Sequence, residues 1–444
     1  MDPVIIGLIG VVILFFLLTL GVHIGIALGI AGFIGILIIS GFEQAISMNV
    51  TSVYHKISNP SLITLPLFIL MGYLASGGGI SRNLFDSLSL WLGKIRGGLG
   101  IASVIGCTAF GTVCGSSVVT TAVFCKICAP EMRRHGYSKS VAYAICASSG
   151  SIGMLIPPSI IAIVYGMLSG VSIGKVLMAG VAPGLLWCLF FSLTIILIGK
   201  LKPSSIPVSL TSATWRQRFV SLKLWWPILI VAVCIFGGIY GGVFTPSEAA
   251  AVASFVLFTV YVMANILRKR AKDRQKSVRE LNFLLMDTAT TSALIFLVMG
   301  SATVFSNFIV LTGIATKVLG LITSWGLSKL GLILLFSFIY LILGCFLDSI
   351  SMLCITIPVF NPIIEAAGID PIWYATIVIV SVEVGLITPP VGLNLYAAKG
   401  VAEPDVSLED VISGILPFLA AELLSLILII AFPRISTFLP AFVG

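Results

Sequence analysis

The chain has 444 residues, of which 58% are hydrophobic and only 9% are charged, far below the charged fraction of about 25% found in soluble domains. Its mean hydropathy of +1.16 excludes a soluble globular protein and indicates a polytopic helical membrane protein. The formal net charge is +8, but the basic residues gather between apolar runs, which is a pattern of membrane topology and not of nucleic-acid binding.

Apolar runs that approach or exceed the length needed to cross a hydrocarbon core of about 30 Å recur along the chain. The clearest are residues 4–20, 21–40, 176–199, 227–240, 249–267 and 411–432. The first residues lack the basic segment of a secretory signal, so we expect the first run to remain as a membrane span.

Two basic segments predict the orientation of these spans. Residues 200–223 carry five Lys or Arg and no acid, and residues 268–279 carry seven Lys or Arg and one acid. Lys and Arg accumulate in cytoplasmic segments, so we expect both segments to be cytoplasmic loops joined by two spans. Continued along the chain, this predicts about five crossings per half, about ten in all, and periplasmic N- and C-termini.

Three features recur in the same order in the two halves, at offsets of 232 to 234 residues. Gly79 followed by Trp91 matches Gly313 followed by Trp325, and the polar segment after Gly111 matches that after Gly344; the third pair is the pattern Gly, three residues, Pro-Pro at 153–158 and 385–390. An odd number of crossings per half inverts the second copy. We therefore predict inverted repeats at residues 1–200 and 223–444, joined by a cytoplasmic loop at 201–222.

Residues 84–95 place apolar side chains at helical spacing with charged residues between them. This pattern predicts an amphipathic helix lying at the membrane interface, with a less distinct counterpart near residues 316–325. The alternative is a weakly apolar span. Gly21, Gly25 and Gly29 form a ridge of small residues on the second span, which would pack inside this chain or against a partner.

Residues 98–130 are apolar on both flanks, carry Gly115-Ser116-Ser117 in the middle and have basic residues at both ends. A segment that enters and leaves on one side is a re-entrant hairpin, and half-helices of about 13 residues reach about 20 Å into the bilayer. Its tip offers hydroxyls and free N–H groups at a helix N-terminus, which favour an anion. Residues 330–360 are the predicted mirrored hairpin, entering from the outside. A small-residue contact between ordinary spans is the alternative.

The two Pro-Pro elements predict broken helices at about 139–170 and 371–398. Proline removes a backbone donor and disfavours helix at the preceding residue, so the helix must unwind within the membrane. Unwinding frees carbonyl oxygens, which are good ligands for Na⁺. A kink in a packed helix is the alternative reading.

An ordered set of short motifs resembles the large membrane subunit of tripartite ATP-independent periplasmic (TRAP) transporters over nearly the whole chain. These motifs are Leu65-Pro66-Leu67-Phe68, Gly115-Ser116-Ser117, Pro130-Glu131-Met132, Ala147-Ser148-Ser149-Gly150, Ile156-Pro157-Pro158-Ser159, Thr245-Pro246-Ser247-Glu248-Ala249-Ala250 and Thr388-Pro389-Pro390-Val391-Gly392-Leu393-Asn394. The resemblance implies an all-α inverted-repeat transporter of the elevator type, which imports organic acid anions with Na⁺ across the bacterial inner membrane and is not an enzyme.

The resemblance also implies two Na⁺ sites made mainly of backbone carbonyls. The first falls on Gly111, Cys114, Gly153, Ile156 and Pro158, and the second on Gly344, Gly385, Thr388 and Val391. Cys114 departs from the usual serine, which a carbonyl ligand would tolerate. The expected substrate contacts are Ser116, Ser117, Ser149, Asp348, Ser349 and Asn394.

The family resemblance further implies two partners, a small four-helix membrane subunit and a periplasmic substrate-binding protein. Neither is recognisable in this chain, so both are expected as separate proteins. Sialic acid and C4-dicarboxylates stay open as solutes, and Asp348 and Glu383 leave proton coupling open. A divalent-anion:Na⁺ symporter without a binding protein is the main alternative, and an ion channel is a weaker one. No Gly-rich ATP-binding motif and no metalloenzyme motif is present, and Cys125 and Cys128 lack a second cysteine pair.

Overall fold

The computed structural model describes residues 2–207, 213–267, 271–314, 317, 320 and 328–442, and the regular secondary structure of this part is helical throughout, without β-strands. Within this part, seven helices are long and apolar enough to cross a membrane, and a bent helix pair gives an eighth. The predicted all-α membrane fold is thus confirmed, whereas the number of ten crossings and the positions of the termini stay predictions.

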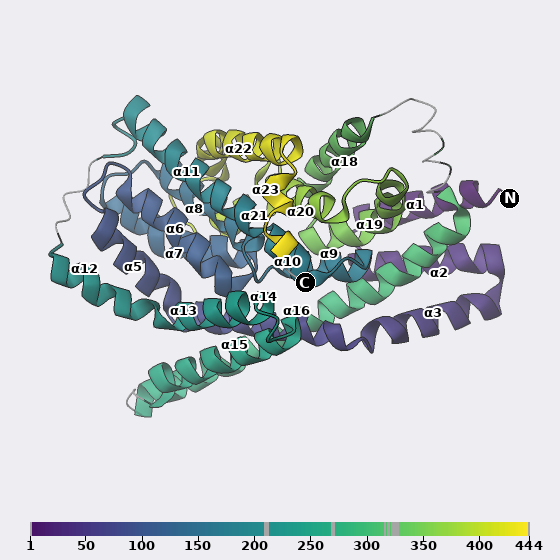
Figure 1. Ribbon diagram of the computed structural model, residues 1–444, viewed down its shortest axis with the longest axis horizontal. Coiled ribbons are helices and arrows are strands. Elements are labelled where there is room, and N and C mark those ends of the chain that lie inside the picture. Colours follow the sequence, from purple (N-terminus) through teal and green to yellow (C-terminus); the bar gives the residue numbers. More distant parts are fainter. Residues whose placement is uncertain are drawn as a thin grey trace.

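The first half of the chain contains the first predicted hairpin and the first broken helix (Figure 1). Its elements are α1 (Pro3–Thr19), α2 (Ile24–Ser40), α3 (Phe42–Ile57), the 3₁₀ segment η1 (Pro60–Ile63), α4 (Thr64–Gly77), α5 (Ile80–Leu92), α6 (Gly98–Cys114), α7 (Ser117–Arg134), α8 (Lys139–Leu155), α9 (Ile160–Ser169), α10 (Ile173–Ala179) and α11 (Val181–Leu201).

The second half repeats the helix pair and the broken helix. Its elements are α12 (Trp215–Ser221), η2 (Leu222–Trp225), α13 (Trp226–Ala232), the π-helical segment η3 (Val233–Gly237), α14 (Gly238–Tyr240), α15 (Pro246–Tyr261), the π-helical segment η4 (Val262–Leu267), α16 (Ala271–Thr312), α18 (Lys329–Gly344), α19 (Ser349–Ala366), α20 (Pro371–Ile387), α21 (Leu393–Gly400), α22 (Leu408–Ala431), α23 (Arg434–Thr437) and η5 (Pro440–Phe442).

The long helix α16 holds the N-terminal helices together. Figure 1 shows α16 extending from the α15 end of the molecule towards α1 and α2. The helix α2 packs closely against it, because a Cβ on Gly32 would lie 2.8 Å from the backbone nitrogen of Phe305. Gly25 and Gly29 also face α16, whereas Gly21 lies in the turn before α2. Gly25 and Gly29 of the predicted ridge therefore pack within this chain, and Gly21 does not belong to this contact.

The two basic segments are more helical than predicted. Residues 215–221 form α12, which starts at a capping box between Thr214 and Gln217, and the described part of the second basic segment is the exposed start of α16. Both were expected as cytoplasmic loops between spans. Their helical parts show that amphipathic helices tolerate one charged, solvent-facing side, and their cytoplasmic location stays a prediction. Residues 208–212 and 268–270 lie outside the described part.

The amphipathic segment forms α5, with Leu84, Phe85 and Leu88 buried. Its Trp91 packs against Trp215 of α12 at 6.2 Å between ring centroids, and the Arg218 side chain lies over the Trp215 ring at 5.0 Å. A band of tryptophan and arginine of this kind is typical of a membrane interface. The predicted counterpart near residues 316–325 lies almost entirely outside the described residues.

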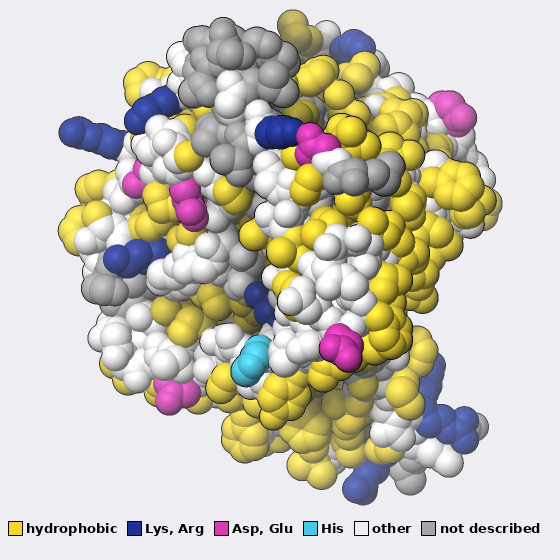
Figure 2. Space-filling model, turned by 90° about the vertical axis from the view of Figure 1, so that its right-hand side faces the viewer, with side chains coloured by type: hydrophobic (Ala, Val, Ile, Leu, Met, Phe, Trp, Pro, Cys, Tyr) yellow, Lys and Arg dark blue, Asp and Glu magenta, His cyan; other side chains and the backbone are white. Residues whose placement is uncertain are grey.

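Outward-facing side chains suit a lipid environment. Leu185, Leu189, Leu193 and Leu197 recur every four residues on α11 and are each at least 50% exposed. Figure 2 shows a broad hydrophobic area on one face of the molecule, with Lys and Arg side chains protruding mostly at its edges.

An ion-pair cluster joins the two halves at the end of α7. Arg133 bonds to Glu403 and, at 2.7 Å, to Asp405, and Lys139 lies 2.7 Å from Asp410 at the start of α22. The guanidinium of Arg133 holds the pKa of Asp405 below its usual value. This exposed cluster connects the first hairpin to the loop between α21 and α22.

The helix pairs α6–α7 and α18–α19 coincide with the predicted hairpins, and each is followed by a helix that breaks at its Pro-Pro pair. α8 and α9 meet at 42°. Ile156 has φ −81° and ψ 131°, and Thr388, 232 residues later, has φ −83° and ψ 124°. Both Pro-Pro bonds are cis. The two halves therefore break their helices with the same local backbone geometry.

Glycine lets each hairpin touch its broken helix backbone to backbone. A Cβ on Gly111 would lie 2.7 Å from the Cα of Gly153, and a Cβ on Gly344 would lie 2.6 Å from the Cα of Gly385. Real Cβ atoms do not approach this closely, and backbone on both sides cannot give way as a flexible side chain can. The hairpin and the break in each half thus form one packed unit.

We predict that Gly111→Ala or Gly344→Ala separates a hairpin from its broken helix. Overpacking of this kind costs about 1–3 kcal/mol of unfolding free energy, measurable by denaturant titration of the purified protein in mixed micelles. Gly174→Ala in α10 is the matched control, since the nearest atom to its Cβ would be 3.8 Å away. Equal stability of all three variants would contradict the close contact.

Candidate functional site

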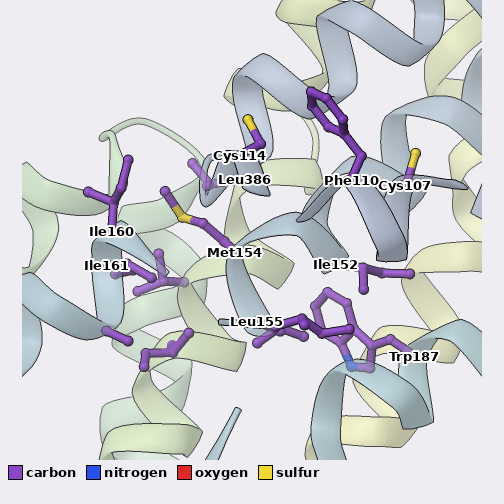
Figure 3. Packing of buried hydrophobic residues seen from close by; sticks show 14 of the residues in the cluster. Cys107, Phe110, Cys114, Ile152, Met154, Leu155, Ile160, Ile161, Trp187 and Leu386 are labelled. Carbon is purple, nitrogen blue, oxygen red and sulfur yellow. The ribbon is translucent and has the colours of Figure 1, made fainter. Parts of the chain in front are cut away.

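The first break leaves backbone carbonyls without their helical donors. Pro157 and Pro158 have no N–H, so the carbonyl oxygens of Gly153 and Met154 lose the i+4 bonds that a continuous helix would supply. Residues 151–160 are all buried. Figure 3 shows this region, with Met154 and Leu155 before the break and Ile160 and Ile161 after it. Buried carbonyls of this kind suit a hard cation such as Na⁺.

The structure brings some of the residues predicted for the first cation site into contact. Gly111 contacts Gly153, and the N–H of Ile160 donates to the Gly115 carbonyl at 3.3 Å. A Cβ on Gly115 would lie 2.5 Å from the carbonyl oxygen of Pro158. The tip of the hairpin is thus in contact with the break on both sides of the proline pair, and Pro158 takes part in this contact, whereas Ile156 packs against Gly184 of α11.

Cys114 lies at the edge of this first site. Its carbonyl oxygen faces α4, where a Cβ on Gly72 would come within 2.7 Å, and its thiol lies 3.8 Å from the Ser116 carbonyl oxygen. A cavity of about 50 Å³ lies here, lined by Cys114, Ser116, Tyr73 and Thr291 among others. The Tyr73 and Thr291 hydroxyls are 3.1 Å apart. Polar groups therefore meet between the hairpin tip and the helices α4 and α16.

The second break repeats the contact with different side chains. The N–H of Gly392 donates to the Cys345 carbonyl at 3.2 Å, matching the bond from Ile160 to Gly115. Thr388 donates its N–H to the Gly385 carbonyl at 3.0 Å and its hydroxyl to the Val384 carbonyl at 2.6 Å. Thr388 and Val391 are half-buried, so this break is more accessible than the first.

The predicted substrate residues serve partly as helix caps. Ser116 caps α7 by accepting from the Val119 N–H at 3.5 Å, and Asp348 caps α19 by accepting from the N–H groups of Ile350 at 3.1 Å and Ser351 at 3.0 Å. Asp348 is exposed and also accepts the Ser351 hydroxyl. The two tips therefore end in equivalent capped N-termini, one with a hydroxyl and one with a carboxylate.

The other four predicted residues lie deeper. Ser149 donates to the Ile145 carbonyl of its own helix at 2.5 Å, and Ser349 is buried at the start of α19. Asn394 donates to Ser151 at 3.3 Å, which joins α21 of the second half to α8 of the first. Ser117 is fully buried. In the part of the chain that the structure describes, no hydrogen bond joins any two of the six predicted residues.

Two buried glutamates lie beside this polar group, Glu383 in α20 and Glu422 in α22. Both are completely buried, and none of their carboxyl oxygens has a hydrogen-bond partner among the described residues; the same holds for Ser117 Oγ and Asn394 Oδ1. Ser117 faces Glu383, and Ser151 faces Glu422. Glu383 was recognisable from the sequence as a candidate, whereas Ser151 and Glu422 were not predicted, although an acid inside the apolar run 411–432 is a signal of function.

The described residues show no cluster of side chains typical of a transition-metal site. They contain no group of three His, Cys, Asp or Glu side chains placed to hold a metal ion. Cys125 and Cys128 are buried in the core as free thiols.

Comparison with known proteins agrees with these observations. The family model described as "Tripartite ATP-independent periplasmic transporter, DctM component" matches residues 11–435. The chain is 34% identical over 424 residues to the C4-dicarboxylate TRAP transporter large permease protein DctM of Pseudomonas aeruginosa, covering 94% of each chain. It is 30% identical over 385 residues to the sialic acid TRAP transporter large permease protein SiaM of Vibrio cholerae, covering 86% of this chain and 87% of that one.

A solved structure shares the fold at low sequence identity. The YdaH transporter of Alcanivorax borkumensis superimposes with a TM-score of 0.66 at 15% identity, covering 97% of this chain and 98% of that one. The relatives are transport proteins, and so this chain is not an enzyme. From the family match and the identity over nearly its full length, the chain belongs to the DctM component family of tripartite ATP-independent periplasmic transporters, as a large permease protein.

Proposed function

We propose that this chain imports an organic acid anion together with Na⁺ across the bacterial inner membrane by an elevator mechanism. The observation that carries the proposal is the repeated contact between a hairpin tip and a broken helix, Gly111 with Gly153 and Gly344 with Gly385. Two such units in one transport domain would each offer backbone carbonyls to a cation, and the domain would move against α1–α4 and α16.

The anion would be recognised mainly by helix N-termini. No Lys or Arg stands in either tip, so N–H groups and hydroxyls at the starts of α7 and α19 would meet a carboxylate, with Ser116 and Ser349 nearest these ends. Asp348 already caps α19, so its carboxylate would repel an anion unless a cation is bound nearby. A bound Na⁺ would offset the repulsion between the Asp348 carboxylate and the anion, so we expect Na⁺ to bind before or with the solute.

The named relatives support an organic acid and two partners. They include permeases for C4-dicarboxylate, ectoine and sialic acid. An isethionate permease protein named DctMQ matches over 95% of this chain, which covers only 64% of that protein. We infer that this chain works with a small four-helix membrane subunit and a periplasmic binding protein that delivers the solute.

The proposed function predicts uptake that needs three components. Proteoliposomes holding this chain and its small subunit should accumulate solute only with an inward Na⁺ gradient and a solute-loaded binding protein outside. Uptake that ignores the binding protein would instead identify a self-sufficient Na⁺ symporter, and unsaturable flux without a gradient would identify a channel.

Thr388 tests the second cation site at one residue. Thr388→Ala removes a hydroxyl that only bonds Val384 and should raise the half-saturating Na⁺ concentration less than about threefold. Thr388→Pro also removes the N–H bond to Gly385 and should abolish at least about nine-tenths of Na⁺-driven uptake. Thr376→Ala, which removes a similar hydroxyl bond one-third of the way along α20, is the control. Equal tolerance of both Thr388 changes would argue against an ion site there.

A further inference from the structure

Lys56 is a half-buried cation at the contact between two parts of the fold. It stands in the last turn of α3, and its Nζ donates to the Met167 carbonyl of α9 at 2.7 Å. α3 packs with α2 and α16, whereas α9 follows the first break. The bond therefore ties an N-terminal helix to the broken helix across 111 positions of sequence.

A cavity of about 300 Å³ opens beside this ammonium group. Its lining residues come from the end of α3 and η1 on one side and from the end of α9 and the start of α10 on the other: Lys56, Asn59, Ser61, Leu62, Gly166, Met167, Gly170, Val171 and Ile173. The volume is at the lower end of ligand pockets, about 300–1,000 Å³. It suits a small organic molecule that has a polar head and an apolar body.

The charge in this cavity is uncompensated. Lys56 is its one charged lining residue, and no ion pair involves Lys56 within the described ranges. The Met167 carbonyl uses one of three ammonium donors, so two are left. Asn59 Oδ1 accepts from the Ser61 N–H at 2.9 Å, which leaves the Asn59 amide nitrogen as a further donor. A partly desolvated ammonium with donors beside it selects an anionic oxygen group.

We propose that this cavity, here called the Lys56 pocket, binds the carboxylate of the transported organic anion where α3 and η1 meet α9 and α10. The inference rests on the proposed import function and adds a binding residue outside both hairpin tips. A carboxylate would accept from the free Lys56 and Asn59 donors, while Leu62, Met167, Val171 and Ile173 would contact its carbon skeleton.

The pocket lies between α3 and α9, so a movement of α9 relative to α3 would change it. If α9 moves with the broken helices while α3 stays with α16, the Lys56 bond to Met167 must break during transport. An anion on Lys56 supplies the ammonium with a replacement acceptor, so that breaking the bond does not leave a half-buried charge without a partner. The solute would thereby favour the moving state.

Lysine reactivity tests the pocket directly, in the complex with the small subunit in lipid nanodiscs. Brief acetylation read by mass spectrometry would be compared with succinate, sialic acid or ectoine present, and with neutral succinamide at equal ionic strength. At ten times its Kd a ligand leaves about a tenth of sites free, so Lys56 labelling should slow about tenfold. Lys175, two residues beyond Ile173 on α10, is the internal control and should be unaffected.

Selective protection of Lys56 by at least one carboxylate supports the pocket. No protection by any of the three, equal protection of Lys175, or equal protection by succinamide overturns it. This result does not depend on transport activity.

Uptake separates the pocket from the proposed function. Where the wild type transports, Lys56→Gln should raise the half-saturating concentration of loaded binding protein about tenfold or more, because a charge-assisted bond is lost. Lys56→Arg should recover most of the loss, and Lys175→Gln should behave as wild type. If Lys56→Gln also behaves as wild type, the pocket is refuted and the import function stands. If the wild type itself shows no Na⁺-driven uptake, the proposed import function is refuted. The acetylation experiment alone then tests whether the Lys56 pocket binds a carboxylate.

Discussion

Every backbone N–H and carbonyl inside a bilayer must find a partner within the protein, and two proline pairs violate this requirement in the middle of helices. Pro157-Pro158 and Pro389-Pro390 each remove two consecutive donors. The arrangement of the surrounding helices shields the carbonyl groups at these two proline pairs from lipid. A hairpin tip is laid against each break, and glycine on both sides allows the backbones to meet, Gly111 with Gly153 and Gly344 with Gly385.

The two units are equivalent in backbone and different in chemistry. The bond from Ile160 to Gly115 is matched by that from Gly392 to Cys345, and the backbone angles at Ile156 and Thr388 nearly coincide. Yet a serine caps one hairpin helix and an aspartate the other, and the first break is buried whereas the second is partly accessible. Two related sites with unequal access suit a carrier in which one site fills from the surface while the other stays closed.

Between the units lies a polar interior that neither half forms alone. Asn394 reaches Ser151 across the two halves, and Glu383 and Glu422 lie beside them without hydrogen-bond partners among the described residues. Burying two carboxyls is expensive. The core of this region therefore tolerates acidic groups, in a chain with only 17 Asp and Glu.

Proline chemistry and the repeat offsets were sufficient to predict the breaks and the hairpins, because these depend on local backbone rules and near-constant spacing. The pairing of Gly111 with Gly153 came from the family resemblance and not from these rules. The cap at Asp348 was missed, because this residue was assigned to the substrate, although an aspartate before a helix is a cap signal. The helices at 215–221 and 271–279 were not predicted, because the basic residues in these segments were interpreted as a sign of loops. Contacts between distant elements, such as Lys56 with Met167 or Asn394 with Ser151, carry no local signal and needed the fold.

The central claim is that each hairpin and break together hold one cation. Cryo-EM maps of the complex with the small subunit in nanodiscs, recorded in Na⁺ and in choline at equal ionic strength, test it most directly. The account predicts ion density beside the Gly111–Gly153 contact and beside the Gly344–Gly385 contact in Na⁺, and its loss in choline. Identical maps in both salts, from a preparation whose uptake depends on Na⁺, would contradict it.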